Sequence, residues 1–243
     1  MEIFRKMSFA DSTGDAIPFY HEGKYHIFSL TSPPGTTVYP ERLRTTWSHS
    51  ISDDLVHWQE LPTALYPGEG DEPDASGVWT GSVIYGEGQY HAFYTGYCLT
   101  AEFQQTICHA TSDDGITWTK DIANPVITPM TELYEKLDWR DPYVFYNEED
   151  ENYWILISAR RLDMPVTRRG CIVLYRSKNL KDWTYYGPIY SPGHTNCPEC
   201  PEMYKMGGHW YLSYSRFSEF VNTIYRVSES PFGPWRKPKK DGI

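Results

Sequence analysis

Hydrophobic and polar residues alternate along most of the chain, in short runs that are rich in aromatic and β-branched side chains. Pairs of such runs flank tight polar turns: AIPFY and YHIFSL lie on either side of HEGK, and PYVFY and YWILISAR on either side of NEEDEN. This order is typical of an antiparallel hairpin. No segment keeps a 3.6-residue apolar period, so the pattern predicts an all-β chain.

A third run follows each hairpin and ends in a polar turn and a tryptophan. The third runs cover residues 45–52, 106–112, 170–177 and 223–230. The turns that follow are SDDLVHW, SDDGITW, SKNLKDW and SESPFGPW, whose tryptophans stand 60, 65 and 52 residues apart, and each tryptophan is expected to begin a fourth strand. A four-stranded antiparallel unit that recurs at this spacing predicts the blades of a β-propeller.

The number of repeats sets the expected size of the propeller. The fourth repeat ends close to residue 243, whereas a propeller must close its ring to protect its edge strands. Either the ring has four blades or a further blade is missing, and the end of the chain so soon after the fourth repeat favours a missing blade. We therefore expect a β-propeller of four-stranded antiparallel blades that is truncated after about four blades. The polar turns are interpreted as structural caps, because short polar side chains bond to the nearby backbone.

Composition narrows the possible partners. The formal net charge of −10 disfavours nucleic acid as a partner, and aromatic residues at 16% suit strands and sugar-binding clefts. No apolar run is long enough to span a membrane, and residues 1–15 contain no signal-peptide core, so we expect a cytoplasmic protein. Five cysteines without a paired zinc motif are interpreted as reduced thiols. We expect no metal and no cofactor, and the sequence leaves the oligomeric state open.

Acidic residues stand near the start of the first strand in three of the four repeats. They are Asp15 in GDAIPF, Asp141 in WRDPYVF and Glu199 in CPECPEMY. First strands line the channel of a propeller, so we expect these acids to occupy equivalent positions at one mouth. Glycosidic hydrolysis needs an acid for the leaving oxygen, a second carboxylate, and a group that holds hydroxyls. Taken singly, Asp15 would also fit a turn residue, Asp141 a structural ion pair, and Glu199 an ordinary surface glutamate.

Several stretches of the chain are similar to glycoside hydrolase family 32, the β-fructofuranosidases (invertase, inulinase and levanase), whose clan includes family 43. The most specific are Arg140-Asp141-Pro142 and Glu199-Cys200-Pro201, supported by residues 47–67 and 76–84. The resemblance implies a five-bladed β-propeller, usually followed by a β-sandwich, so we expect residues 1–243 to form one catalytic domain, a five-bladed β-propeller truncated after about four blades. It also implies retaining hydrolysis of a small oligosaccharide or disaccharide through a covalent fructosyl–enzyme intermediate.

The resemblance also implies roles for individual residues. Asp15 is the expected nucleophile, Glu199 the general acid/base and Asp141 the transition-state stabiliser. The expected substrate-binding residues are Arg140, which also orients the acids, Cys200 beside Glu199, and Trp79, Thr80, Ser82 and Trp47. Trp47 fits core packing equally well. Weaker candidates are Glu202, His194 and Trp139.

The first family motif is altered here, which leaves alternatives open. The family reads Trp-Met-Asn-Asp-Pro-Asn-Gly, whereas this chain has Ser-Thr-Gly-Asp-Ala-Ile-Pro around Asp15. The acid is kept but its neighbours are not, so the resemblance supports the mechanism more strongly than the substrate. One alternative is an inverting arabinosidase or xylosidase like those of family 43. Another is a catalytically silent carbohydrate-binding propeller. A phosphorylase would need a basic cluster, which we do not find.

Overall fold

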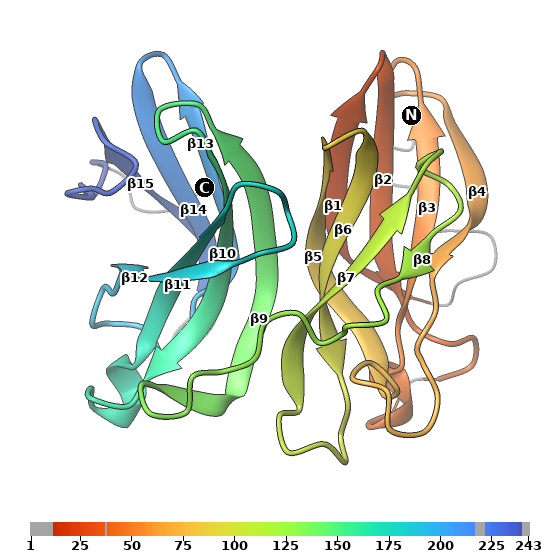
Figure 1. The fold of residues 1–243 in the computed structure, drawn as a ribbon, viewed down its shortest axis with the longest axis horizontal. Coiled ribbons are helices and arrows are strands. Elements are labelled where there is room, and N and C mark those ends of the chain that lie inside the picture. The colour runs from red at the N-terminus through yellow and green to blue at the C-terminus, as the bar shows by residue number, and fades with distance from the viewer. Residues whose placement is uncertain (1–11, 37, 217–221, 240–243) are drawn as a thin grey trace. The chain divides into compact units, whose positions relative to one another are not determined.

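The computed structural model describes residues 12–36, 38–216 and 222–239. Residues 1–11 and 240–243, on which the expectations about a signal peptide and a truncated ring partly depend, lie outside the described residues. The chain forms two compact units, Met1–Ile127 and Thr128–Ile243. Each unit contains two antiparallel sheets (Figure 1). The expectation of one catalytic domain over residues 1–243 stays a prediction.

The first unit holds two four-stranded meanders, in which each strand pairs with the next one in sequence. The first sheet consists of β1 (Thr13–His21), β2 (Lys24–Thr31), β3 (Thr46–Ser52) and β4 (Trp58–Leu65). The second consists of β5 (Gly77–Gly86), β6 (Gln89–Tyr97), β7 (Gln105–Ser112) and β8 (Thr119–Lys120). A short 3₁₀ helix, η1 (Glu41–Leu43), lies between β2 and β3.

The second unit repeats this plan with one difference. Its first sheet consists of β9 (Tyr134–Asn147), β10 (Asn152–Arg161), β11 (Gly170–Ser177) and β12 (Thr184–Tyr190), with the 3₁₀ helix η2 (Val166–Arg168) before β11. Its other sheet has three strands within the described residues: β13 (Glu199–Met206), β14 (His209–Arg216) and β15 (Asn222–Ser228). In place of a fourth strand, the described part of this sheet shows an isolated bridge from Val227 to Arg236.

The predicted all-β class and the propeller blades are confirmed. The expected third strands match β3, β7, β11 and β15 to within two residues at each end. Trp58 begins β4 as expected, and β8 and β12 begin one residue after their tryptophans. The expected fourth strand at Trp235 is wrong for the described residues, since Arg236 makes only the isolated bridge. Within those residues, no helix has the length and hydropathy that a membrane span requires.

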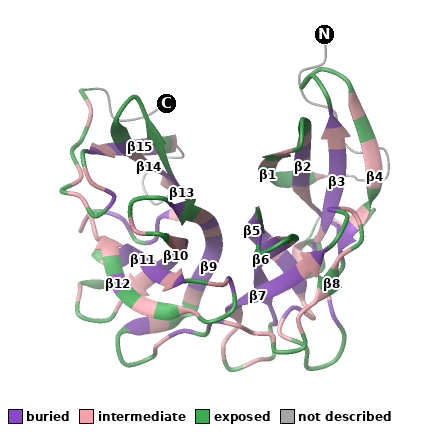
Figure 2. Cartoon of the chain, turned by 45° about the horizontal axis from the view of Figure 1, so that its top comes forward, coloured by how far each residue is buried: buried purple, intermediate pink, exposed green. Residues whose placement is uncertain are grey.

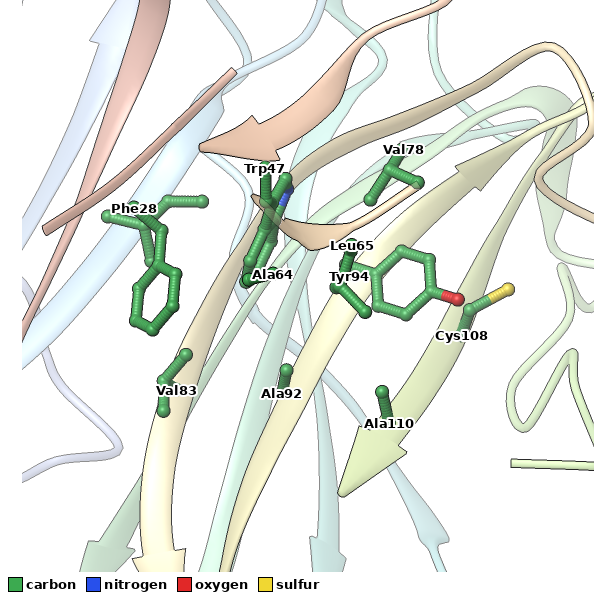
Figure 3. Packing of buried hydrophobic residues seen from close by; sticks show 11 residues of the cluster. Phe28, Trp47, Ala64, Leu65, Val78, Val83, Ala92, Tyr94, Cys108 and Ala110 are labelled. Carbon is green, nitrogen blue, oxygen red and sulfur yellow. The ribbon is translucent and has the colours of Figure 1, made fainter. Parts of the chain in front are cut away.

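Each unit buries an apolar core of its own. Burial runs along β3 and β7 in the first unit and along β10 and β11 in the second (Figure 2). The core of the first unit lies between its two sheets, where Phe28 and Trp47 face Val83, Ala92 and Tyr94 (Figure 3). In the second unit, residues of β10 and β11 pack against residues of β13, β14 and β15. The sheets thereby fix the first strands, which carry the candidate residues.

Candidate active site

Each of the four first strands contains a β-bulge at the same point. In β9, Arg140 faces Ser158 and Tyr143 faces Leu156, so two residues of β9 oppose one residue of β10. In the other first strands, two residues likewise oppose a single residue of the neighbouring strand. These pairs are residues 15–16, 79–80 and 200–201. A bulge bends its strand and redirects a side chain, and bulges are common beside active sites. The four bulges therefore mark one repeated feature of the blades.

The register shows which residues are equivalent between blades. Asp15, Trp79, Asp141 and Cys200 are the first residues of the four bulges. Asp15 and Asp141 thus occupy equivalent positions, as expected. The expectation is wrong for Glu199, which precedes its bulge and occupies the position that Arg140 has in β9. The third acid is offset because Cys200, rather than an acid, stands first in the bulge of β13.

Two of these bulges have an unusual backbone. The φ angles of Asp141 and Cys200 are +55° and +48°, although each residue precedes a proline, where an extended conformation is the rule. A left-handed conformation is tolerated by Asp but is costly for Cys, and it persists only where the surroundings impose it. The proline that follows offers no N–H, which suits the unpaired side of a bulge. Backbone strain therefore coincides with the two most specific motifs of the sequence.

Arg140 joins the acids of the second unit. Its Nη2 donates to Glu199 Oε1 at 2.8 Å, and its Nε lies 3.8 Å from Asp141 Oδ2. The backbone N–H of Cys200 donates to the same Asp141 oxygen at 3.0 Å. Arg140 and Asp141 are buried, whereas the Glu199 side chain is 29% exposed. The structure therefore brings together Arg140, Asp141, Glu199 and Cys200, with Glu199 the most accessible of the acids.

The charges of this cluster compensate one another. Burial alone would lower the pKa of Arg140, but the carboxylates of Asp141, Glu199 and Asp138 raise it well above its usual value. Burial raises the pKa of the Cys197 thiol to about 12. Cys197 therefore stays a neutral thiol, and Arg140 is the positive charge that the acids share.

Asp138 was not among the candidates from the sequence. Its carboxylate accepts from Arg140 Nη1 at 2.6 Å and from Arg160 Nη1 at 3.1 Å. Burial alone would raise the pKa of Asp138, but Arg140 and Arg160 outweigh that effect and lower it. Residues two apart on a strand share a face, so the spacing of Asp138 and Arg140 could have suggested this pair.

In the first unit, Asp15 accepts a hydrogen bond from a neutral group of the neighbouring sheet. The Thr80 hydroxyl donates to Asp15 Oδ2, which joins the bulges of β1 and β5. Asp15 itself is exposed, whereas Thr80 and Ser82 are buried. Trp79 stacks on Tyr97 at 4.1 Å between ring centroids. The structure therefore places Asp15 and Thr80 in contact, with Trp79 and Ser82 on the same strand as Thr80.

Trp47 is a core residue. Its side chain is fully buried, and its indole N–H donates to the carbonyl of Trp79 at 2.9 Å. Of the two interpretations of Trp47, packing therefore holds, and the predicted contact with substrate is wrong, because no surface of the ring is accessible. Trp139, a weaker candidate for sugar stacking, is fully buried as well.

Metal ligands do not gather in the described parts of the chain. Across residues 12–36, 38–216 and 222–239, no three His, Cys, Asp or Glu side chains meet as a metal site would require. The cluster described above supplies carboxylates, the Arg140 guanidinium and the Cys200 N–H. Such a set can transfer protons and bind hydroxyls.

Known proteins share this sequence and this fold. The family model "Glycosyl hydrolases family 32 N-terminal domain" matches residues 15–232. A levanase of Bacillus subtilis is 33% identical over 198 residues, which are 77% of this chain and 26% of that protein. A raffinose invertase of Escherichia coli is 32% identical over 202 residues, 79% of this chain and 39% of that protein.

Solved structures show the same fold. Fructan 1-exohydrolase IIa from Cichorium intybus superposes with a TM-score of 0.77 at 24% identity, covering 95% of this chain and 45% of that one. This chain thus spans less than half the length of each of these three proteins. The matched residues include the whole segment from Asp15 to Glu199. The chain therefore belongs to glycosyl hydrolase family 32, of which it carries the N-terminal domain.

Proposed function

We propose that the protein hydrolyses β-fructofuranosides with retention of configuration, using Asp15, Asp141 and Glu199. The observation that carries the proposal is the Arg140-linked pair of Asp141 and Glu199 at the bulges of β9 and β13. Both bulges lie within the segment matched by the family model. Ion pairs and backbone strain are concentrated there, as is common where a protein orients reacting groups.

The proposed reaction has two steps. First, Glu199 gives its proton to the glycosidic oxygen while Asp15 attacks the anomeric carbon, so the leaving alcohol departs and a fructosyl ester forms on Asp15. Next, the Glu199 carboxylate takes a proton from water, whose oxygen displaces Asp15 and releases fructose. The partial exposure of Glu199 suits a group that must meet both substrate and water.

Asp141 and Arg140 serve as binding groups in this proposal. Asp141 is fixed by Cys200 N–H and by its backbone conformation, which suits a carboxylate that accepts hydrogen bonds from sugar hydroxyls. Such bonds strengthen as positive charge develops on the sugar ring. Arg140 holds both acids at fixed positions and offsets their mutual repulsion.

The substrate class is inferred from relatives. The names levanase and raffinose invertase refer to proteins that match more than three quarters of this chain. We propose that sucrose, raffinose or short fructans are the substrates, with no nucleic acid or membrane as partner. The altered residues around Asp15 leave the choice among these sugars to experiment.

A fructoside panel tests the proposal. The full-length gene product is assayed for fructose release from sucrose, kestose, inulin and levan. We expect turnover that Glu199→Gln and Asp15→Asn abolish. Glu229→Gln, at an exposed glutamate in the same unit as Glu199, serves as the matched control and keeps activity. Sugar binding without release of fructose by the folded protein would favour the silent propeller instead.

Stereochemistry separates the retaining from the inverting mechanism. The family match does not favour the family-43-like alternative. Retention predicts that β-fructofuranose is released first, which carbon-13 NMR or polarimetry detects before mutarotation. Initial release of the α anomer would support the inverting alternative.

Location in the cell is also a proposal. Cys98, Cys108, Cys171, Cys197 and Cys200 are all free thiols in the structure. Free thiols are usual where thioredoxin and glutathione keep proteins reduced, so we propose a cytoplasmic enzyme. Cell fractionation with an antibody to the protein tests this, and recovery in the secreted fraction would contradict it.

A further inference from the structure

A chain of alternating charges extends from Glu199 across β9 and β10 to Arg169, the residue before β11. We call it the charge ladder, and its members in order are Glu199, Arg140, Asp138, Arg160, Glu135 and Arg169. Arg160 Nη1 lies 2.6 Å from Glu135 Oε2, and Arg169 pairs with the other oxygen of Glu135. All six side chains are less than a third exposed. The ladder therefore continues well beyond the candidate acids.

Asp138 is the member that fixes Arg140. One of its oxygens accepts from Arg140 and the other accepts from Arg160, so the carboxylate is held from both sides. Arg140 in turn uses one terminal nitrogen for Asp138 and the other for Glu199. Two charge-assisted bonds at opposite ends of a planar guanidinium leave it no freedom to rotate.

Asp138 also sets the balance of charge around Glu199. Among the described residues of this unit, Arg140 pairs with Glu199, Asp141 lies beyond Arg140, and the buried Cys197 thiol close to these charges stays neutral. The positive charge of Arg140 thus lies directly beside the group that is proposed to donate the proton. Asp138 offsets part of that positive charge without touching Glu199.

We propose that Asp138 is a positioning residue of the hydrolase, which locks the Arg140 guanidinium onto Glu199 and keeps Glu199 able to donate a proton. This rests on the proposed function, since it assigns proton donation to Glu199. Asp138 acts through Arg140 and does not itself contact the sugar.

Two variants separate the charge of Asp138 from its hydrogen bonds. Asp138→Asn keeps one acceptor for Arg140 but removes the negative charge. Asp138→Ala removes both. Asp163→Asn is the matched control, because Asp163 also pairs with an arginine of this unit, Arg161, but stands outside the ladder. Thermal unfolding of each variant shows whether it is folded.

The first measurement is the pH dependence of kcat/KM on the fructoside that the full-length protein cleaves. Without the Asp138 charge, ionisation of Glu199 costs less, so the protonated acid is lost at lower pH. We expect the alkaline limb of the Asp138→Asn profile to move by roughly one pH unit toward acid. The Asp163→Asn profile should coincide with that of the wild type. An unmoved limb in Asp138→Asn would overturn the proposal, since a merely stabilising residue leaves the profile unchanged.

The second measurement does not depend on turnover. A guanidinium held at both ends gives separate, slowly exchanging Nη–H signals in nitrogen-15 NMR, and Arg140→Lys assigns them. We expect these signals in the wild type and in Asp163→Asn, and their loss or averaging in Asp138→Ala. Unchanged Arg140 signals in Asp138→Ala would refute the lock. If the wild type cleaves no fructoside, the proposed function fails, while this measurement still decides whether Asp138 positions Arg140.

Discussion

The two units of this chain hold equivalent bulges by different means. In the second unit the bulges of β9 and β13 are joined by ions, through Arg140, Asp141 and Glu199. In the first unit the bulges of β1 and β5 are joined by the Thr80 hydroxyl on Asp15. The linking group is thus a neutral hydroxyl in the first unit and a charged guanidinium in the second.

The largest expected effect comes from the acid that the first unit supplies. Asp15→Asn keeps the shape and the bond from Thr80 but removes the proposed nucleophile, so kcat should fall by about 10³-fold or more. Fructose release by the full-length protein measures this. Asp53→Asn, at an exposed aspartate in the turn between β3 and β4 that pairs with Lys24, is the control and should keep full activity. Comparable activity of the two variants would remove Asp15 from the mechanism.

The next effect concerns the guanidinium of the second unit. Arg140→Lys keeps the charge but replaces a planar group with three partners by a single ammonium, so we expect kcat/KM to fall by about 10²-fold. Arg176→Lys, at a half-buried arginine that pairs with Asp150, is the matched control. If both lysine variants behaved like the wild type, the acids would not depend on Arg140 for their positions.

A fall in pH should destabilise the first unit before the second. Burial, with help from His26, lowers the pKa of His49 to about 3, and among the described residues the buried Nδ1 of His49 has no hydrogen-bond partner that could stabilise its protonated form. The neutral form therefore stabilises the fold fully above pH 6.5, and this contribution is lost as pH falls from 6.5 toward 3, by about 1.4 kcal/mol per pH unit. The lowered pKa of Asp138 costs stability only below its unfolded value near 3.8.

Urea unfolding at pH 6.5 and 5.0 tests this pH dependence. His49→Gln should lose about 2 kcal/mol less than the wild type between these values. His209→Gln, at an exposed histidine of β14, should follow the wild type. The same loss in the wild type and in His49→Gln would show that His49 does not cause the acid sensitivity.

The smallest effect tests the bond that joins the bulges of the first unit. Thr80→Val keeps the shape but removes the donor to Asp15, so kcat/KM should fall by about fivefold to tenfold. Thr80→Ser restores the hydroxyl and should restore most of the activity. Equal losses in the valine and serine variants would point to packing rather than to the hydrogen bond.

The blade pattern could be predicted from the sequence because each strand repeats its own signals. Alternation, tight turns and the tryptophan after each polar turn located the third strands, and residues 170–177 match β11 at both ends. The polar turns also behave as expected, since Ser52 Oγ accepts from the N–H groups of Asp54 and Leu55. These signals come from residues close together in the sequence, so they can be interpreted without knowing how the sheets pack.

The geometry of the bulges could not be predicted in this way. A residue before proline is normally extended, so neither Asp141 nor Cys200 signals its left-handed backbone. Without the bulges, the one-residue offset of Glu199 is invisible. Trp47 was ambiguous because an aromatic residue on an alternating strand can face either the core or a ligand. Tertiary packing decides such cases, and a local sequence pattern carries no information about that packing.

Azide rescue tests the central claim most directly. In the full-length Glu199→Ala variant, azide replaces water at the fructosyl–enzyme intermediate, so no general base is needed. We predict that azide restores turnover of a fructoside with a good leaving group and gives β-fructosyl azide, the retained anomer. Asp15→Ala should give the α anomer, if any product forms. Absence of rescue in a folded Glu199→Ala variant, or α-fructosyl azide from it, would contradict Glu199 as the acid/base of a retaining furanosidase.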